Sequence, residues 1–287
     1  MVLNSTMRAL INKLKDIKLA IFDLDGVIYR GDSLIPNVDK IIQELKNQGI
    51  KIVYNSNNST ATRQTYVERL KSFNIESEIA DFYTSASIAS SEISKIKKKA
   101  NIFVIGEIGL RTELESFGHI ILTNPKDYNK VDFVVVGLDR NFNYDNLAIA
   151  QRCILEGKAQ FYATNTDSTL PVVNGLKPGA GVMVNALKTC TGRDPNKVFG
   201  KPESIGIEMI LNENKIPNNN ACIFGDRLNT DILAGNRSAI ITILVLTGVT
   251  TRTMIMDLEE NKKKDKDFNK NLIPDIVVDN LDEIFKM

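Results

Sequence analysis

Cysteine is scarce in this chain of 287 residues, and tryptophan is absent. The three cysteines, Cys153, Cys190 and Cys222, lie far apart in apolar surroundings, and no two of them have the spacing of a metal-binding pair. Isolated cysteines of this kind are usually reduced, buried thiols in proteins of a reducing compartment. They therefore favour a cytoplasmic location and exclude a cysteine-based metal motif.

Long apolar runs are also missing. The most apolar stretch, residues 239–246, is far shorter than a membrane span. Residues 1–18 are too polar for a secretory signal, although their apolar side chains have the spacing of an amphipathic helix. A charge excess is missing too, because the formal net charge is +1. We therefore expect neither a membrane partner nor a nucleic-acid partner.

Apolar residues make up 43% of the chain and charged residues 25%, which is typical of a globular protein. The first part alternates short apolar runs with helical spacing: strands at 19–22 and 50–54, and helices at 36–49 and 61–73. Such alternation predicts an α/β fold in which helices cover a parallel sheet.

Two further blocks continue this alternation. In the second block we predict strands at 102–105, 120–122, 133–136 and 161–163, and helices at 110–117, 144–155 and from 181 to about 189. In the third block we predict a helix at 205–211, strands at 222–224, 240–246 and 276–278, a helix from 230, and an exposed loop at 261–270. The length allows one large domain or a domain with a second module.

Two acidic residues end the first predicted strand. Asp23 and Asp25 follow residues 19–22, and alternate residues of an extended segment point the same way. Crowded carboxylates are costly unless a cation or a shared proton relieves their repulsion. An EF-hand beginning at Asp23 is excluded, because Ile28 and Leu34 occupy its glycine and final acid positions. We therefore predict a Mg²⁺ site with a carboxylate that is free to do chemistry.

Other polar residues follow predicted strands or lie in loops, namely Ser56, Asn57, Lys201, Asp226 and Asp231. Ligands of open α/β sheets bind beyond the carboxyl ends of the strands, so these residues could meet there. Asp226 directly follows a predicted buried strand, but the other four residues also have a simpler interpretation. The first two could cap the next helix, the lysine could lie on the surface, and Asp231 could be a first-turn acid favoured by the helix dipole.

Taken together, these groups suit phosphoryl transfer. A divalent metal needs hard oxygen ligands, and a phosphate needs donors such as a hydroxyl, backbone N–H groups and an ammonium. One carboxylate can act as nucleophile to give an aspartyl-phosphate, and a second can act as general acid and then as base.

The order of these motifs resembles that of the haloacid dehalogenase-like phosphatases. The matching segments are FDLDG at 22–26, Ser56, Gly200-Lys201-Pro202 and GDRLNTD at 225–231. The resemblance implies that Asp23 is the nucleophile and a Mg²⁺ ligand. It also implies that Asp25 is the general acid and base and offers its backbone carbonyl to the metal.

The same resemblance assigns the remaining groups. Ser56, Asn57 and Lys201 would hold the phosphate, Asp226 would be the remaining protein ligand of Mg²⁺, and Asp231 would support it from nearby. An acid two residues after the nucleophile favours hydrolysis of phosphate esters over dehalogenation, because an alkoxide leaving group needs a proton.

The long stretch between Ser56 and Lys201 looks like the large C2-type cap of one subgroup. That subgroup contains NagD-type nucleotidases, 4-nitrophenylphosphatases, phosphoglycolate phosphatase and pyridoxal phosphatase. We therefore expect a Rossmann-like, three-layer core at 1–85 and 193–287, with an α/β cap inserted at 86–192. Dimerisation through the cap is a further expectation from the resemblance.

Substrate selection is expected in the cap loop at 165–172, which includes Asn165 and Leu170. The apolar Leu170 is more similar to the phosphoglycolate and 4-nitrophenyl phosphate branch, so a small phosphorylated metabolite is the expected partner. A nucleotidase or pyridoxal phosphatase is the first alternative. A phosphotransferase, or a binding protein without catalysis, is the second.

Overall fold

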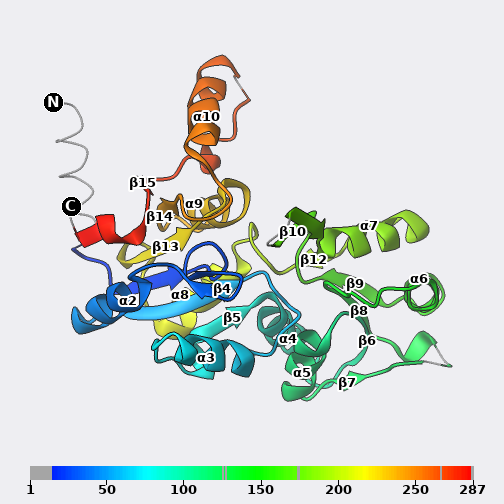
Figure 1. The fold of residues 1–287 in the computed structure, drawn as a ribbon. Helices are drawn as coiled ribbons and strands as arrows, with labels where there is room; N and C mark the ends of the chain where they lie inside the picture. The colour runs from blue at the N-terminus through cyan, green and yellow to red at the C-terminus, as the bar shows by residue number, and fades with distance from the viewer. Residues whose placement is uncertain (1–14, 125, 127, 173–174, 266, 286–287) are drawn as a thin grey trace. The chain divides into compact units, whose positions relative to one another are not determined.

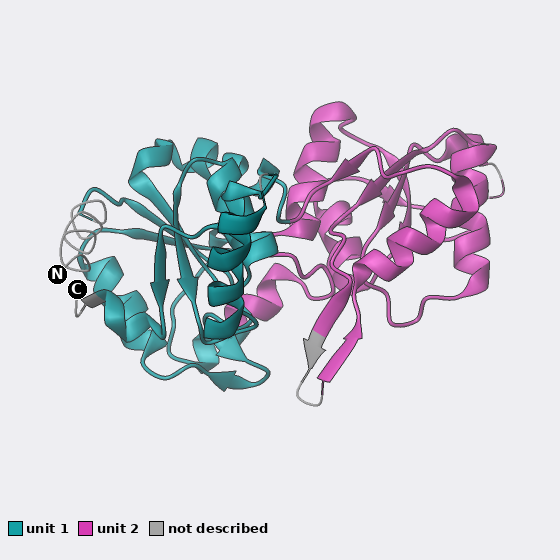
Figure 2. Ribbon diagram, turned by 90° about the horizontal axis from the view of Figure 1, so that it is seen from above, with its two compact units in different colours: residues 1–55, 69–82, 201–287 teal, residues 56–68, 83–200 magenta. Residues whose placement is uncertain are grey.

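The computed structural model describes residues 15–124, 126, 128–172, 175–265 and 267–285. Contacts divide the chain into two compact units (Figure 2). Unit 1 comprises Met1–Asn55, Arg69–Phe82 and Lys201–Met287, and unit 2 comprises Ser56–Glu68 and Tyr83–Gly200.

Unit 2 is wider than the insertion expected at 86–192, because it also includes residues 56–68, 83–85 and 193–200. Two contacts explain why residues 56–68 belong to it. Gly109 N–H donates to the Thr60 carbonyl at 3.1 Å, and Arg63 Nε lies 2.9 Å from Glu113 Oε1. The segment after β4 (Lys51–Ser56) therefore packs with the second unit.

The sheet of unit 1 has six strands in the order β15-β14-β13-β1-β4-β5 (Figure 1). Their bounds are Ile276–Val278, Ile241–Val245, Ala221–Gly225, Leu19–Phe22, Lys51–Ser56 and Phe82–Thr84. β1 pairs in parallel with both β13 and β4, and all four of its residues are buried. The rings of Phe22 and Phe224 stack across β1 and β13 with centroids 4.4 Å apart. The predicted parallel α/β sheet is confirmed.

The helices of this unit are α2 (Val38–Asn47), α8 (Ile205–Asn214), α9 (Leu233–Arg237) and α10 (Arg252–Lys264), with short hairpin strands β2 (Tyr29–Arg30) and β3 (Ser33–Leu34). Helix α3 (Arg63–Ser72) is divided between the two units after Glu68. The loop predicted at 261–270 is wrong in its first part, because α10 continues to Lys264. An N-cap bond from Met254 N–H to the Thr251 hydroxyl and an i,i+4 ion pair between Glu260 and Lys264 stabilise this exposed helix.

Unit 2 has its own parallel sheet, in the order β12-β9-β8-β6-β7. Its strands are Lys197–Val198, Gln160–Ala163, Phe133–Val136, Asn101–Ile105 and Ile120–Ile121. Helices α6 (Tyr144–Leu155) and α7 (Ala180–Thr191) pack with β6, β8 and β9 into one apolar core, and α4 (Ser85–Ile96) packs against α5 (Ile108–Ser116). β10 (Thr169–Val172) and β11 (Gly175–Pro178) form an antiparallel hairpin.

Short 3₁₀ turns complete the described chain, at Ile79–Asp81, Tyr128–Lys130, Asn218–Asn220, Lys270–Leu272 and Leu281–Phe285. Across the described ranges, we find no helix with the length and apolar character needed to cross a membrane.

Candidate functional site

Two neighbouring strands are each followed directly by an aspartate. Asp23 directly follows β1, and Asp226 directly follows β13. The strands pair in register, with Phe22 opposite Phe224, and Asp23 N–H extends the ladder by donating to the Phe224 carbonyl at 2.9 Å. Because both strands run in the same direction, their carboxylates emerge at the same edge of the sheet.

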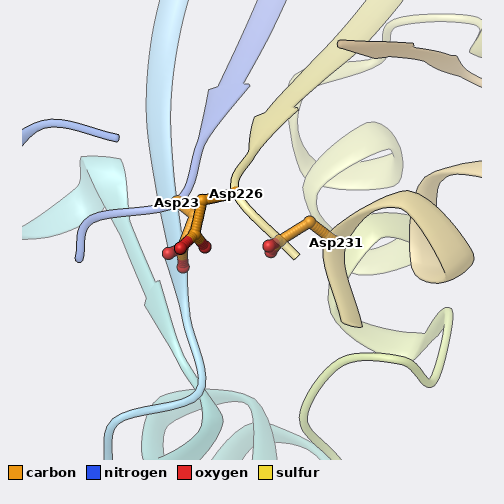
Figure 3. Close-up of side chains that lie close together, drawn as sticks. All are labelled: Asp23, Asp226 and Asp231. Carbon is orange, nitrogen blue, oxygen red and sulfur yellow. The ribbon is translucent and has the colours of Figure 1, made fainter. Parts of the chain in front are cut away.

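A third carboxylate joins this pair. Asp231 lies in a π-helical turn, η4 (Leu228–Ile232), immediately before α9, where its Oδ2 accepts the Arg227 N–H at 3.1 Å. One carboxylate oxygen from each of Asp23, Asp226 and Asp231 lies within 4.8 Å of the other two. Figure 3 shows the carboxylates of Asp23 and Asp226 side by side, with that of Asp231 pointing toward them. We call these three residues the acidic cluster.

Lys201 contacts the acidic cluster directly. Its Nζ lies 2.6 Å from Asp23 Oδ1 and 2.6 Å from Asp231 Oδ1, and it donates to the Asn55 carbonyl at 2.7 Å. The lysine side chain is only 3% exposed. The surface interpretation of Lys201 is therefore wrong, since its ammonium is buried among three acceptors.

Burial and repulsion dominate the electrostatics of the cluster. Burial raises the pKa of Asp23 well above its usual value, Asp231 and Asp226 raise it further, and Lys201 opposes them. Burial, followed by repulsion from Asp231, raises the pKa of Asp226 to about 7. Burial alone would lower the pKa of Lys201, but the facing carboxylates raise it above its usual value.

The cluster is well suited to a cation. Three carboxylates face one ammonium, and buried charge of one sign is costly unless it is compensated. Carboxylate oxygens are the hard ligands that Mg²⁺ and Ca²⁺ prefer. Asp23, Asp226 and Asp231 therefore fit a divalent cation, by donor type and by charge.

Asp25 lies outside the acidic cluster, as an exposed residue of the otherwise buried turn that follows β1. Gly26 allows this turn with its positive φ of 85°, and its N–H donates to the Tyr29 carbonyl at 2.8 Å. The surrounding protein raises the pKa of Asp25 by desolvation, against the opposing charges of Arg69, Arg227 and Lys201. A raised carboxyl pKa suits a group that must hold and release a proton.

Ser56 is the last residue of β4, the strand beside β1, and its Oγ accepts the Asn58 N–H at 3.2 Å. The helix-capping interpretation of Ser56 and Asn57 is not what the structure shows. α3 begins at Arg63, and the Thr62 hydroxyl accepts the Thr65 N–H at 3.2 Å near its start.

Asn57 instead bonds to the loop after β9. Its Nδ2 donates to Asp167 Oδ2 at 3.0 Å, and its carbonyl accepts from Asn165 Nδ2 at 2.8 Å and from the Ser85 hydroxyl at 2.6 Å. Asn165 is buried, whereas Leu170, in β10, packs against the core of unit 2.

Two contributors were not singled out from the sequence. They are Asp167, which lies within the loop expected at 165–172 to select the substrate, and the loop after β14. Asp167 could have been noticed as the one acid of the Asn165-Thr166-Asp167 segment. In the loop, the Val249 N–H donates to Asp226 Oδ2 at 2.7 Å. Every residue except proline has a backbone N–H, so the type of residue 249 does not predict this bond. The adjacent Gly248 was the one indication in the sequence that the loop approaches another group closely.

Comparisons with known proteins agree with this geometry. Residues 20–120 match a family model described as haloacid dehalogenase-like hydrolase, and residues 198–284 match one described as HAD-hydrolase-like. An acid sugar phosphatase of Staphylococcus haemolyticus is 35% identical over 253 residues, which are 88% of this chain and 92% of the relative.

Two further relatives are similar over most of their length. Phosphoglycolate phosphatase 2 of Arabidopsis thaliana is 33% identical over 277 residues, covering 90% of this chain and 91% of the relative. The solved structure of a p-nitrophenyl phosphatase from Archaeoglobus fulgidus has a TM-score of 0.85 and 34% identity, covering 95% of this chain and all of that one (100%).

Proposed function

Since the chain belongs to the haloacid dehalogenase-like hydrolases, we propose that it is a Mg²⁺-dependent phosphatase that hydrolyses small phosphate monoesters through an aspartyl-phosphate. One observation carries this proposal. The Asp23 carboxylate, at the end of a central strand, shares Lys201 with Asp231 and lies beside Asp226. An oxygen nucleophile, a fixed ammonium and an anionic metal site therefore adjoin one another.

In the first step, a carboxylate oxygen of Asp23 attacks the phosphorus of the ester. The new O–P bond forms as the bond to the ester oxygen breaks, and Asp25 donates a proton to the departing alkoxide. The raised pKa of Asp25 supports this role, because the carboxyl must carry a proton when the alkoxide leaves.

In the second step, water attacks the phosphorus of the aspartyl-phosphate. Asp25, now ionised, takes a proton from this water, and the bond from phosphorus to Asp23 breaks. Inorganic phosphate is released, the Asp23 carboxylate is restored, and Asp25 again carries its proton. Asp25 thus serves as acid and then as base.

Asp23 and Asp226 would hold the Mg²⁺ ion, with Asp231 nearby as support and the backbone carbonyl of Asp25 as a further ligand. When bound, the ion offsets the negative charge of the carboxylates and of the phosphoryl group. Lys201 holds Asp23 and Asp231 in place through the contacts described above.

Ser56, Asn57 and Lys201 are the proposed phosphate-binding groups. A hydroxyl, an amide and an ammonium are donors, which suits a phosphate that is rich in acceptors. The bonds from Asn57 to Asp167 and Asn165 restrict its orientation, which supports a positioning role for this turn.

The proposed substrate is a small phosphorylated metabolite, with phosphoglycolate first. The names of two relatives, an acid sugar phosphatase and a phosphoglycolate phosphatase, support a small polar substrate. Nucleoside monophosphates and pyridoxal phosphate are the alternatives.

The test is phosphate release from a panel of esters, with Mg²⁺ and with EDTA. The panel contains phosphoglycolate, a sugar phosphate, UMP, pyridoxal phosphate and 4-nitrophenyl phosphate. We expect release only with Mg²⁺, and loss of at least about a thousandfold in rate for Asp23→Asn. Asp275→Asn is the matched control and should keep activity. Asp275 accepts hydrogen bonds from Thr242 at the start of β14 and directly precedes β15, so this pair lies at the opposite end of the parallel strands from the cluster. Release that is equal in EDTA would contradict the proposal, as would transfer to an added alcohol in excess of release.

A further inference from the structure

The loop that follows β14 holds Asp226 at two points. The Val249 N–H donates to Asp226 Oδ2 at 2.7 Å, and the Thr250 N–H donates to the Asp226 carbonyl at 3.1 Å. One bond fixes the carboxylate and the other fixes the backbone of the same residue. Both donors belong to the main chain, so the shape of the loop, rather than its side chains, makes these contacts.

Gly248 lies against the Asp226 side chain, with no space for a methyl group. A Cβ placed on Gly248 would be 1.9 Å from Asp226 Oδ2 and 2.4 Å from its Cβ and Cγ. A Cβ on Gly26 would likewise be 2.5 Å from the same Oδ2, and it would be 2.9 Å from the Gly248 Cα. The carboxylate therefore lies against the bare backbone of two glycines that also adjoin each other.

The loop is also tied to the turn after β1. The Thr247 hydroxyl donates to the Gly26 carbonyl at 2.6 Å, and Arg30 Nε donates to the Thr247 carbonyl. The same short segment thus bonds to the turn that follows Asp23 and to Asp226, the residue after β13. It links two of the three segments that supply the acidic cluster.

We propose that residues 247–250 are a positioning element for the metal site, and that Gly248 is the residue on which its fit depends. The loop fixes the rotamer of Asp226 through Oδ2 and keeps this carboxylate beside Asp23. This inference rests on the proposed function, in which Asp226 is a metal ligand. Partners that orient metal ligands are typically worth about 10–100-fold in metal affinity.

The test is direct Mg²⁺ binding to the full chain by calorimetry, without substrate. In Gly248→Ala the methyl group must displace Asp226 or the loop, so we expect Mg²⁺ affinity to fall about 10–100-fold. At saturating Mg²⁺, most of the turnover number should return. Calorimetry measures the Mg²⁺ affinity, which depends on the position of the Asp226 carboxylate, without requiring catalysis.

Gly235→Ala is the matched control. A Cβ on Gly235, in α9, would also be crowded, 2.5 Å from Thr242 Cγ2 and 2.6 Å from Ile223 Cγ2. These neighbours are aliphatic carbons and not the acidic cluster. We expect Gly235→Ala to lower thermal stability while it binds Mg²⁺ like the wild type.

Thr247→Val provides a second variant that does not crowd the site, in case Gly248→Ala fails to fold. It removes only the hydroxyl bond to the Gly26 carbonyl, and we expect a several-fold loss of Mg²⁺ affinity. Wild-type affinity in each folded loop variant would overturn the inference while leaving the proposed function intact. Absence of Mg²⁺ binding by the wild type would instead overturn the proposed function, and this inference with it.

Discussion

Replacing Lys201 with methionine removes the ammonium that bonds to Asp23 and Asp231 while keeping a side chain of similar length. The lysine side chain is 3% exposed, and both contacts are 2.6 Å. The variant leaves buried carboxylates facing one another without this cation. Their charges can then be relieved only by protonation, by structural change or by a bound metal.

Removal of one partner from a buried ion pair typically costs about 3–5 kcal/mol, because the remaining charge stays buried. We therefore expect Lys201→Met to lower the free energy of unfolding by about 3–5 kcal/mol at pH 7 in EDTA. The loss should shrink as the pH falls, because Asp23 already has a raised pKa and needs no partner once it is protonated. Mg²⁺ should restore part of the stability.

Lys197→Met is the matched control. Lys197 Nζ also lies 2.6 Å from a carboxylate oxygen, Glu92 Oε2, but its side chain is 32% exposed. Exposed ion pairs contribute about 1 kcal/mol or less. The two lysines therefore differ in how deeply their side chains are buried, while their contact distances are the same. A comparison of the two variants measures the effect of this burial on stability.

Urea unfolding followed by circular dichroism suits this comparison, because the chain has no tryptophan for fluorescence. Each variant is measured at pH 7 and at pH 5, with EDTA and with Mg²⁺. If Lys201→Met costs no more than Lys197→Met, or if its loss does not depend on pH, the charge-balance reasoning for the acidic cluster is refuted.

Two further predictions concern single carboxylates. Asp25→Asn should slow hydrolysis of alkyl phosphates at least about tenfold more than hydrolysis of 4-nitrophenyl phosphate, whose leaving group needs no proton; equal losses in kcat would remove Asp25 as the general acid. Glu107→Gln should remove about 1 kcal/mol or less at pH 7, because Arg140 Nε donates to Glu107 Oε1 at 2.6 Å and lowers the pKa of that carboxyl. Because the pKa of Glu107 is lower in the folded state than in the unfolded state, its ionised form stabilises the fold at pH values above the unfolded-state pKa. The difference in unfolding midpoint between Glu107→Gln and the wild type should therefore disappear as the pH falls below about 4. A difference that stays constant with pH would contradict this prediction.

The meeting of Asp23 and Asp226 could be predicted from the sequence, because both follow short apolar strands of one parallel sheet. The approach of Asp231 depends on the π-helical turn η4, which helical periodicity does not reveal. The burial of Lys201 could not be predicted either. A lysine is usually exposed, and this one is buried because its partners come from distant parts of the chain.

Most of helix α4 was missed for a related reason, since only its lysine-rich end, from residue 95, suggested a helix. Its sequence is rich in serine and alanine, so it has no clear stripe of large apolar side chains. The structure buries these small residues, and Ser90 satisfies its hydroxyl by bonding to the Ala86 carbonyl at 2.8 Å. Apolar periodicity identifies helices that bury leucine and isoleucine, as in α2, better than helices that pack through small side chains.

The structure buries His119, the one histidine of the sequence. Its Nδ1 accepts the Ala100 N–H at 3.2 Å, and its Nε2 lies 3.0 Å from the Ser94 hydroxyl. The residue is therefore structural in unit 2. The partners that bury His119 come from α4 and from the residue before β6. The sequence around His119 does not indicate that either of them lies close to it.

The stereochemical course at phosphorus tests the central claim most directly. The substrate is a phosphorothioate monoester made chiral with oxygen isotopes, and the configuration of the released thiophosphate is measured in the presence of Mg²⁺. Attack by Asp23 followed by attack by water gives two in-line displacements, each with inversion, so the account predicts net retention. Net inversion would mean that water attacks the ester directly, and it would contradict the role of Asp23 as nucleophile.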